Sequence, residues 1–108
     1  MKNCGLGLAL IALLGSQTAW AGQANITEGK RKSTVCQSCH GVDGNSASAE
    51  YPKLAGQHAD YLQQALLDYK SGARKSPVMA GFVAALSPQD MADLAAYFAS
   101  QKGLKLKY

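Results

Sequence analysis

The sequence predicts a small all-α domain in which three helices are joined by two long loops. Apolar side chains recur at helical spacing in the second half of the chain, as they do on the buried face of an amphipathic helix. No stretch alternates polar and apolar residues for long enough to predict a strand. Residues 41–57 and 73–86 are rich in glycine, proline and other turn formers, and we predict that both are loops. Loops of this length are uncommon in so small a domain unless they enclose something.

The first 21 residues are expected to be an export signal rather than part of the fold. Lys2 precedes a nearly unbroken apolar run, residues 6–14, and Ala19-Trp20-Ala21 has the small-residue pattern of a cleavage site. The apolar run is about half of the roughly 20 residues that a spanning helix needs. We therefore expect a cleaved signal, a single mature domain of residues 22–108 without a membrane span, and export to the bacterial periplasm. An uncleaved membrane anchor is the alternative.

The composition of this mature chain limits what can hold it together and what it can bind. Cleavage removes Cys4 and leaves Cys36 and Cys39, and one closely spaced pair cannot staple distant segments. So short a chain buries only a modest core, which favours a large apolar cofactor at its centre. The formal net charge of +4 becomes +3 without Lys2. This mild charge could steer the protein toward an acidic partner or merely keep it soluble, and it gives little support for nucleic-acid binding.

The first two helices are predicted from a cap and from apolar spacing. Asn25 and Glu28 have the spacing of a capping box and predict a helix that runs into the cysteine pair at about residue 39. A second helix is predicted over residues 58–71, and Gly72 is the expected stop. Its apolar positions are Tyr61, Leu62, Ala65, Leu66 and Tyr69.

The last helix has the clearest start in the chain. Ser87 is the expected N-cap, Pro88 fits the first helical position, and Asp90 lies near the positive end of the helix dipole. We expect the helix to end at Gly103, with Lys102 in its last turn. The predicted buried stripe consists of Met91, Leu94, Ala95 and Phe98.

The chemistry of the chain is concentrated in Cys36-Gln37-Ser38-Cys39-His40, which has the C-x-x-C-H pattern of covalent haem attachment. Residues three apart share a helix face, so both thiols can add to the vinyl groups of one porphyrin. His40 then follows directly and can bind the iron. A thioredoxin-like redox pair would require strands that this sequence lacks. A zinc site would require a fourth ligand, for which only His58 is an obvious candidate.

The second axial ligand has three candidates. Met91 belongs to the predicted buried stripe of the last helix, so we expect it in the core. Met79 lies between Pro77 and Gly81 in a predicted loop, where the backbone can approach the ring closely, and it is the predicted ligand. A thioether favours ferrous iron and raises the potential relative to two histidines. His58 is the remaining alternative, although its position at the start of a helix suits capping or a surface hydrogen bond better.

Four stretches of the chain resemble the class I c-type cytochromes, and within them one half of the dihaem cytochrome c-four proteins. These stretches are residues 35–41, 51–58, 77–81 and 86–98. The resemblance implies the small class I cytochrome c fold, with three main helices and two long loops wrapped around one covalently attached haem c. The chain departs from those proteins in having one haem motif where they have two, which excludes transfer between haems within the chain.

The resemblance also implies roles for three further residues. The carbonyl of Pro52 would accept the Nδ1 proton of His40 and so orient the imidazole. Leu54 would line the haem pocket. Gly29 would let the first helix cross closely over Leu94 and Tyr97 or Phe98 of the last helix.

A haem with both axial positions filled has no open site for a substrate, so an electron carrier is expected rather than an enzyme. Its partners would be redox proteins, and their docking surfaces could be acidic. A free periplasmic carrier is the favoured reading. The alternatives are the haem-bearing subunit of a dehydrogenase or oxidase complex, and a haem enzyme or gas sensor with a labile sixth ligand.

Overall fold

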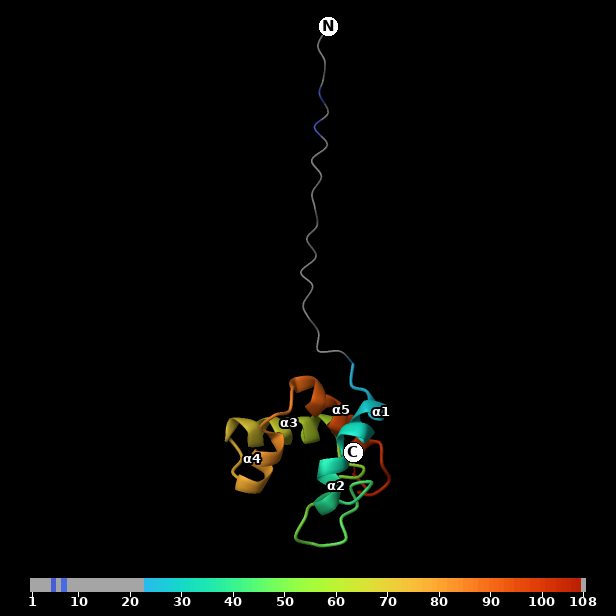
Figure 1. Cartoon of the computed structure of the whole chain (residues 1–108). Coiled ribbons are helices and arrows are strands. Elements are labelled where there is room, and N and C mark those ends of the chain that lie inside the picture. The colour runs from blue at the N-terminus through green and yellow to red at the C-terminus, as the bar shows by residue number, and fades with distance from the viewer. Residues whose placement is uncertain (1–4, 6, 8–22, 108) are drawn as a thin grey trace.

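The computed structural model describes residues 5, 7 and 23–107, and the predicted signal and its cleavage site otherwise lie outside the described residues. The described part contains five helices and no strand, so the all-α prediction is confirmed (Figure 1). The helices are α1 (Ile26–Lys32), α2 (Thr34–His40), α3 (Ala59–Ser71), α4 (Pro77–Val83) and α5 (Pro88–Ala99). Within residues 23–107, no helix has the length and apolar character needed to cross a membrane.

The first predicted helix is divided in two at Ser33. Asn25 caps α1 as expected, with its side-chain oxygen accepting the N–H of Glu28 at 3.0 Å. The Ser33 hydroxyl donates to the carbonyl of Lys30 at 2.7 Å, and this local bond competes with regular helical pairing. The next helix starts at once, because the Ser33 carbonyl accepts the N–H of Cys36 at 2.8 Å. The cysteine pair therefore lies on its own short helix, α2.

The segment 73–86 was predicted to be a loop throughout, but it contains the helix α4. Ser76 caps this helix by accepting the N–H of Met79 at 3.2 Å, and Pro77 follows at the start of the helix. Proline is tolerated there because the first helical N–H has no partner within the helix. Met79 is consequently a helical residue, and the prediction that placed it in a loop was wrong.

α3 and α5 follow their predicted patterns, except that α5 ends earlier than expected. Gly72 ends α3 in the left-handed conformation, with φ of +85°. The Ser87 hydroxyl and Asp90 carboxylate complete the capping box of α5, each accepting the other's N–H. This helix ends at Ala99 rather than near Gly103. Gly103 instead lies against Ala55, where a Cβ atom would come within 2.6 Å of the Ala55 Cβ.

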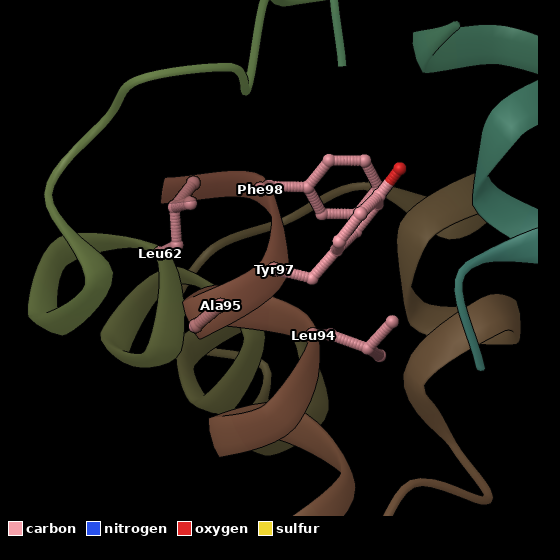
Figure 2. Close-up of a cluster of buried hydrophobic side chains, with 5 residues drawn as sticks. All are labelled: Leu62, Leu94, Ala95, Tyr97 and Phe98. Atoms are coloured by element: carbon pink, nitrogen blue, oxygen red, sulfur yellow. The ribbon is translucent and has the colours of Figure 1, made fainter. Parts of the chain in front are cut away.

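The core is built around α5, against which both α1 and α3 pack. Leu94, Ala95, Tyr97 and Phe98 of this helix form one buried cluster with Leu62 of α3 (Figure 2). The two aromatic rings lie 5.0 Å apart, centre to centre. The Tyr97 hydroxyl leaves the apolar cluster and donates to the carbonyl of Val42 at 2.9 Å, which holds the loop after α2 against α5.

Gly29 lies where α1 crosses α5. A Cβ atom built there would lie 2.0 Å from the carbonyl oxygen of Asp93 and 2.8 Å from the Cβ of Tyr97. No side chain fits at such distances. The close crossing that the resemblance implied is therefore present, and its nearest neighbours on α5 are Asp93 and Tyr97.

Replacing Gly29 with alanine should destabilise the protein, although the same change usually stabilises a helix by roughly 0.5–1 kcal/mol. Here the added methyl group forces the two helices apart, and overpacking of this kind costs about 1–3 kcal/mol or more. Denaturant unfolding of the purified protein measures the change. Gly81→Ala in α4 is the matched control, because a Cβ there meets nothing within 4 Å. Equal effects of the two substitutions would contradict the steric explanation.

A buried polar cluster also ties α1 to α5. Asp93 is 2% exposed and accepts hydrogen bonds from Asn25 N, Gln89 Nε2 and Lys32 Nζ at 2.7–2.8 Å. Burial opposes ionisation of Asp93, but these bonds outweigh it and lower its pKa. Lys32 also forms an ion pair with Asp90. Hydrogen bonds from Lys32 and from the Ser87 N–H together lower the pKa of Asp90 to about 2. Both carboxylates thus stabilise the fold above the ordinary aspartate pKa, and this contribution is lost as the pH falls toward their lowered values.

Candidate haem site

One cavity brings together all six residues that were predicted to form the site. Its volume is about 440 Å³, within the usual range for cofactor pockets. Its walls come from α2, α3, α4, α5 and the loop that follows α2. The predicted site residues on these walls are Cys36, Cys39, His40, Pro52, Leu54 and Met79.

The two cysteines lie one turn apart on α2, and no disulfide joins them. Burial raises the pKa of Cys36, which keeps its thiol protonated. Reactive redox cysteines need the opposite shift, because the thiolate is the nucleophile. Within residues 23–107, no three His, Cys, Asp or Glu side chains are grouped so that they could hold a metal ion. Cys36 is therefore poorly suited to thiol exchange, and the pair lacks further zinc ligands nearby within residues 23–107, whereas two thiols on one helix face suit attachment of a porphyrin.

His40 is the last residue of α2 and is 9% exposed. Its Nδ1 lies 2.8 Å from the carbonyl oxygen of Pro52. A carbonyl can only accept a hydrogen bond, so Nδ1 carries a proton, and the tautomer selected in the neutral ring has its lone pair on Nε2. An imidazole fixed in this way has one nitrogen available for a metal.

The loop after α2 returns to the site through backbone hydrogen bonds. Gly41 directly follows His40 with φ of +88°, which turns the chain away from the helix. The carbonyl of Gly44 then accepts the N–H groups of Leu54 and Ala55, at 2.8 and 3.2 Å. These bonds place the Pro52 carbonyl within hydrogen-bond distance of the imidazole and Leu54 against the apolar core.

Met79 comes to the cavity from a different element. It is half-buried near the start of α4, which packs mainly against α3. The two competing ligands lie elsewhere. Met91 is 1% exposed in the core, and His58 is an exposed residue at the start of α3 whose side chain makes no capping bond. Neither of them lines the cavity.

The cavity as a whole suits a haem. In c-type cytochromes an imidazole nitrogen and a thioether sulfur bind the iron, and two cysteine thiols bond covalently to the vinyl groups of the porphyrin. Most of the wall between them is apolar, with Leu62 and Leu66 of α3 and Leu94 and Phe98 of α5. These side chains would exclude water from the macrocycle. The donor set and the apolar wall thus both fit a covalently bound haem.

Sequence reasoning missed two polar groups that support or line this site. Asp93 is buried on α5, and its partner Asn25 is far away in the sequence. Arg74 lines the cavity, with its guanidinium carbon 4.9 Å from the centre of the Tyr69 ring. No local pattern in the sequence marked either of them.

Comparison with known proteins adds independent findings. The family model described as cytochrome c matches residues 26–102. Cytochrome c4 of Pseudomonas aeruginosa is 44% identical over 95 residues, which cover 88% of this chain and 47% of that protein. A thiosulfate dehydrogenase electron acceptor from Stutzerimonas stutzeri is 39% identical over 93 residues, covering 83% of this chain and 43% of that protein.

A solved structure is similar as well. The reduced recombinant cytochrome c4 from Pseudomonas stutzeri superposes with a TM-score of 0.71 at 46% identity, covering 75% of this chain and 47% of that one. The chain thus spans about half the length of the cytochrome c4 relatives that it matches.

Proposed function

Because the chain belongs to the cytochrome c family, we propose that it is an electron carrier of the bacterial periplasm, with one haem bound covalently through Cys36 and Cys39. The observation that carries this proposal is the convergence of two thiols, an oriented imidazole and a thioether on one largely apolar cavity. The haem, when bound, supplies a one-electron Fe(III)/Fe(II) couple. The remaining chemistry is the work of the chain's own residues.

The axial ligands proposed for the iron are His40 of α2 and Met79 of α4, which both line the cavity. The Pro52 carbonyl holds the imidazole in one tautomer and orientation, so that Nε2 is presented to the metal. The Met79 sulfur would stabilise the ferrous state and raise the potential relative to two histidines. With both positions filled by protein, no site would be left for a substrate. This favours a carrier over an enzyme.

Leu54 is proposed to line the haem pocket together with the apolar face of α5. It is half-buried and packs against the core cluster that contains Leu94 and Phe98. A dry wall of this kind limits solvent rearrangement when the charge on the metal changes. The exchange of single electrons then requires little reorganisation of the protein.

The partners that we propose are redox proteins with acidic docking surfaces. The net charge without Lys2 is +3, and the exposed Lys53 lies on the cavity wall. Opposite charge on a partner would accelerate the encounter. The electron acceptor relative is consistent with a role in receiving electrons from a separate protein.

The test begins with protein isolated from the periplasm of the native bacterium. We expect an intact mass equal to residues 22–108 plus one haem, with no free thiol, because residues 1–21 are proposed to be a cleaved signal. Its rate of electron exchange with an acidic redox protein should fall as ionic strength rises, since salt screens the attraction. A mass without haem, or one that includes residues 1–21, would contradict the corresponding part of the proposal.

A further inference from the structure

Arg74 is a charged residue on the wall of the cavity that has no role in the function proposed above. It lies in the connection between α3 and α4 and is fixed there by two contacts. Its backbone N–H donates to the carbonyl of Asp68 at 3.0 Å. Its guanidinium carbon lies 4.9 Å from the centre of the ring of Tyr69, a half-buried residue that also lines the cavity. Stacking on an aromatic ring holds a guanidinium group in a defined place.

Arg74 has no acidic partner within residues 23–107. The ion pairs of this part of the chain, counted to 4.0 Å, involve Arg31 and Lys32 alone among the basic residues. Glu50 lines the same cavity but makes no such pair with Arg74. Arg74 is an exposed residue that lines a mostly apolar cavity, so its N–H donors are available to a polar group bound at the edge of that cavity. Its planar fork matches a carboxylate, with which it forms paired hydrogen bonds.

A haem carries two propionate carboxylates on the side of the macrocycle opposite its vinyl groups. Attachment at Cys36 and Cys39 fixes the vinyl side at α2, so the propionates belong on the part of the cavity away from that helix. The end of α3 and the whole of α4 lie on the left in Figure 1, apart from α2 near the centre. We propose that Arg74 binds a haem propionate and that Tyr69 holds the guanidinium in position for it. This inference rests on the proposed function, because it requires the haem.

Lys53 is the other basic residue on the cavity wall. It directly follows Pro52, the partner of His40, and so belongs to the segment on the imidazole side of the site. Its side chain is exposed, as is that of Arg74, but within residues 23–107 it is not stacked on an aromatic ring. An ammonium on a flexible stem is also less suited to paired hydrogen bonds than a guanidinium. These differences favour Arg74.

The test measures the ionisation of the haem propionates in the haem-loaded protein, by following their NMR signals as the pH changes. In Arg74→Gln the pKa of one propionate should rise by about 1–3 units, since an adjacent arginine lowers a carboxyl pKa by that amount. Arg74→Lys keeps the charge but loses the fork, and Tyr69→Leu removes the stacking surface, so both should give smaller shifts. Lys75→Gln is the matched control. It removes the same charge from the next residue, which is exposed and does not line the cavity, and it should change neither propionate.

Two results would overturn this inference while leaving the proposed function intact. One is a haem-loaded Arg74→Gln protein with both propionate pKa values unchanged, and the other is a shift that appears in Lys53→Gln alone. The sulfur-to-iron charge-transfer band should persist in every variant, which shows that any shift does not come from loss of the Met79 ligand. A wild-type protein without covalent haem would overturn both the inference and the proposed function.

Discussion

A chain with both Cys36 and Cys39 replaced by alanine is expected to be largely unfolded and rapidly degraded. Without covalent haem, the cavity of about 440 Å³ is left unfilled between α2, α3, α4 and α5. Empty core volume costs about 24 cal/mol per Å³, so a closed cavity of this size would cost ~10 kcal/mol. This one is partly open to solvent, which makes that figure an upper bound. It is nevertheless comparable to the whole stability of a small domain, about 5–15 kcal/mol.

Circular dichroism and thermal melting of the double variant measure the effect. The control is the wild-type sequence produced without haem attachment, which keeps both thiols and should be equally unfolded. It separates the loss of haem from the change of side chains. Either single variant, Cys36→Ala or Cys39→Ala, keeps one thioether and should fold. A haem-free chain that melts cooperatively would show that the polypeptide core is sufficient by itself.

Replacing Met79 with alanine should convert the carrier into a protein with an open iron site. The variant should lose the sulfur-to-iron charge-transfer band and bind carbon monoxide in the reduced state. Because alanine has the highest helix propensity, α4 should persist, and the effect reports on the missing sulfur. Met79→His should instead keep the site closed and lower the potential markedly, since the thioether's preference for ferrous iron is lost.

Met91→Leu is the control for the Met79 variants. Met91 is the buried methionine of α5, and this near-equal-volume change should cost under about 1.5 kcal/mol and leave the spectrum unaltered. His58→Ala should likewise leave the spectrum unaltered. The ligand assignment would be wrong if Met79→Ala retained the band while one of these variants lost it. A wild-type protein that lacks the band and binds carbon monoxide readily would also contradict the carrier function.

The fold could be predicted where local signals agreed. α3 combines apolar periodicity with a clear stop at Gly72, and α5 combines it with a clear start at Ser87; both helices were found, although α5 ends earlier than predicted. α4 was missed although Ser76-Pro77 repeats the Ser87-Pro88 start of α5, because Gly81 and the short length made the segment resemble a loop. The break at Ser33 depends on a serine hydroxyl bonding to its own helix, which composition does not reveal.

The site could be predicted to the extent that its residues are close in sequence. Cys36, Cys39 and His40 form a contiguous motif, whereas Pro52, Leu54 and Gly29 were identified only through the family resemblance. The structure brings Pro52 to His40 and Gly29 to α5. Arg74 and Asp93 carried no local signal. The role of each depends on a neighbour that is distant in the sequence. Arg74 lines the cavity, and Asp93 binds the start of α1.

The two walls of the site differ in the order in which a folding chain can build them. The His40–Pro52 bond closes a loop of only 12 residues, and the Gly44 carbonyl holds the end of this loop through two backbone hydrogen bonds. Forming the wall on the histidine side therefore costs little chain entropy. α4 buries only Val83 and packs mainly against α3, so it gains little until the rest is in place. In kinetic terms, α4 should dock last and open first, and its amides should exchange at a lower free energy than those of α5. The sulfur–iron bond would then form last, and it would hold α4 on a domain that has already folded on the histidine side.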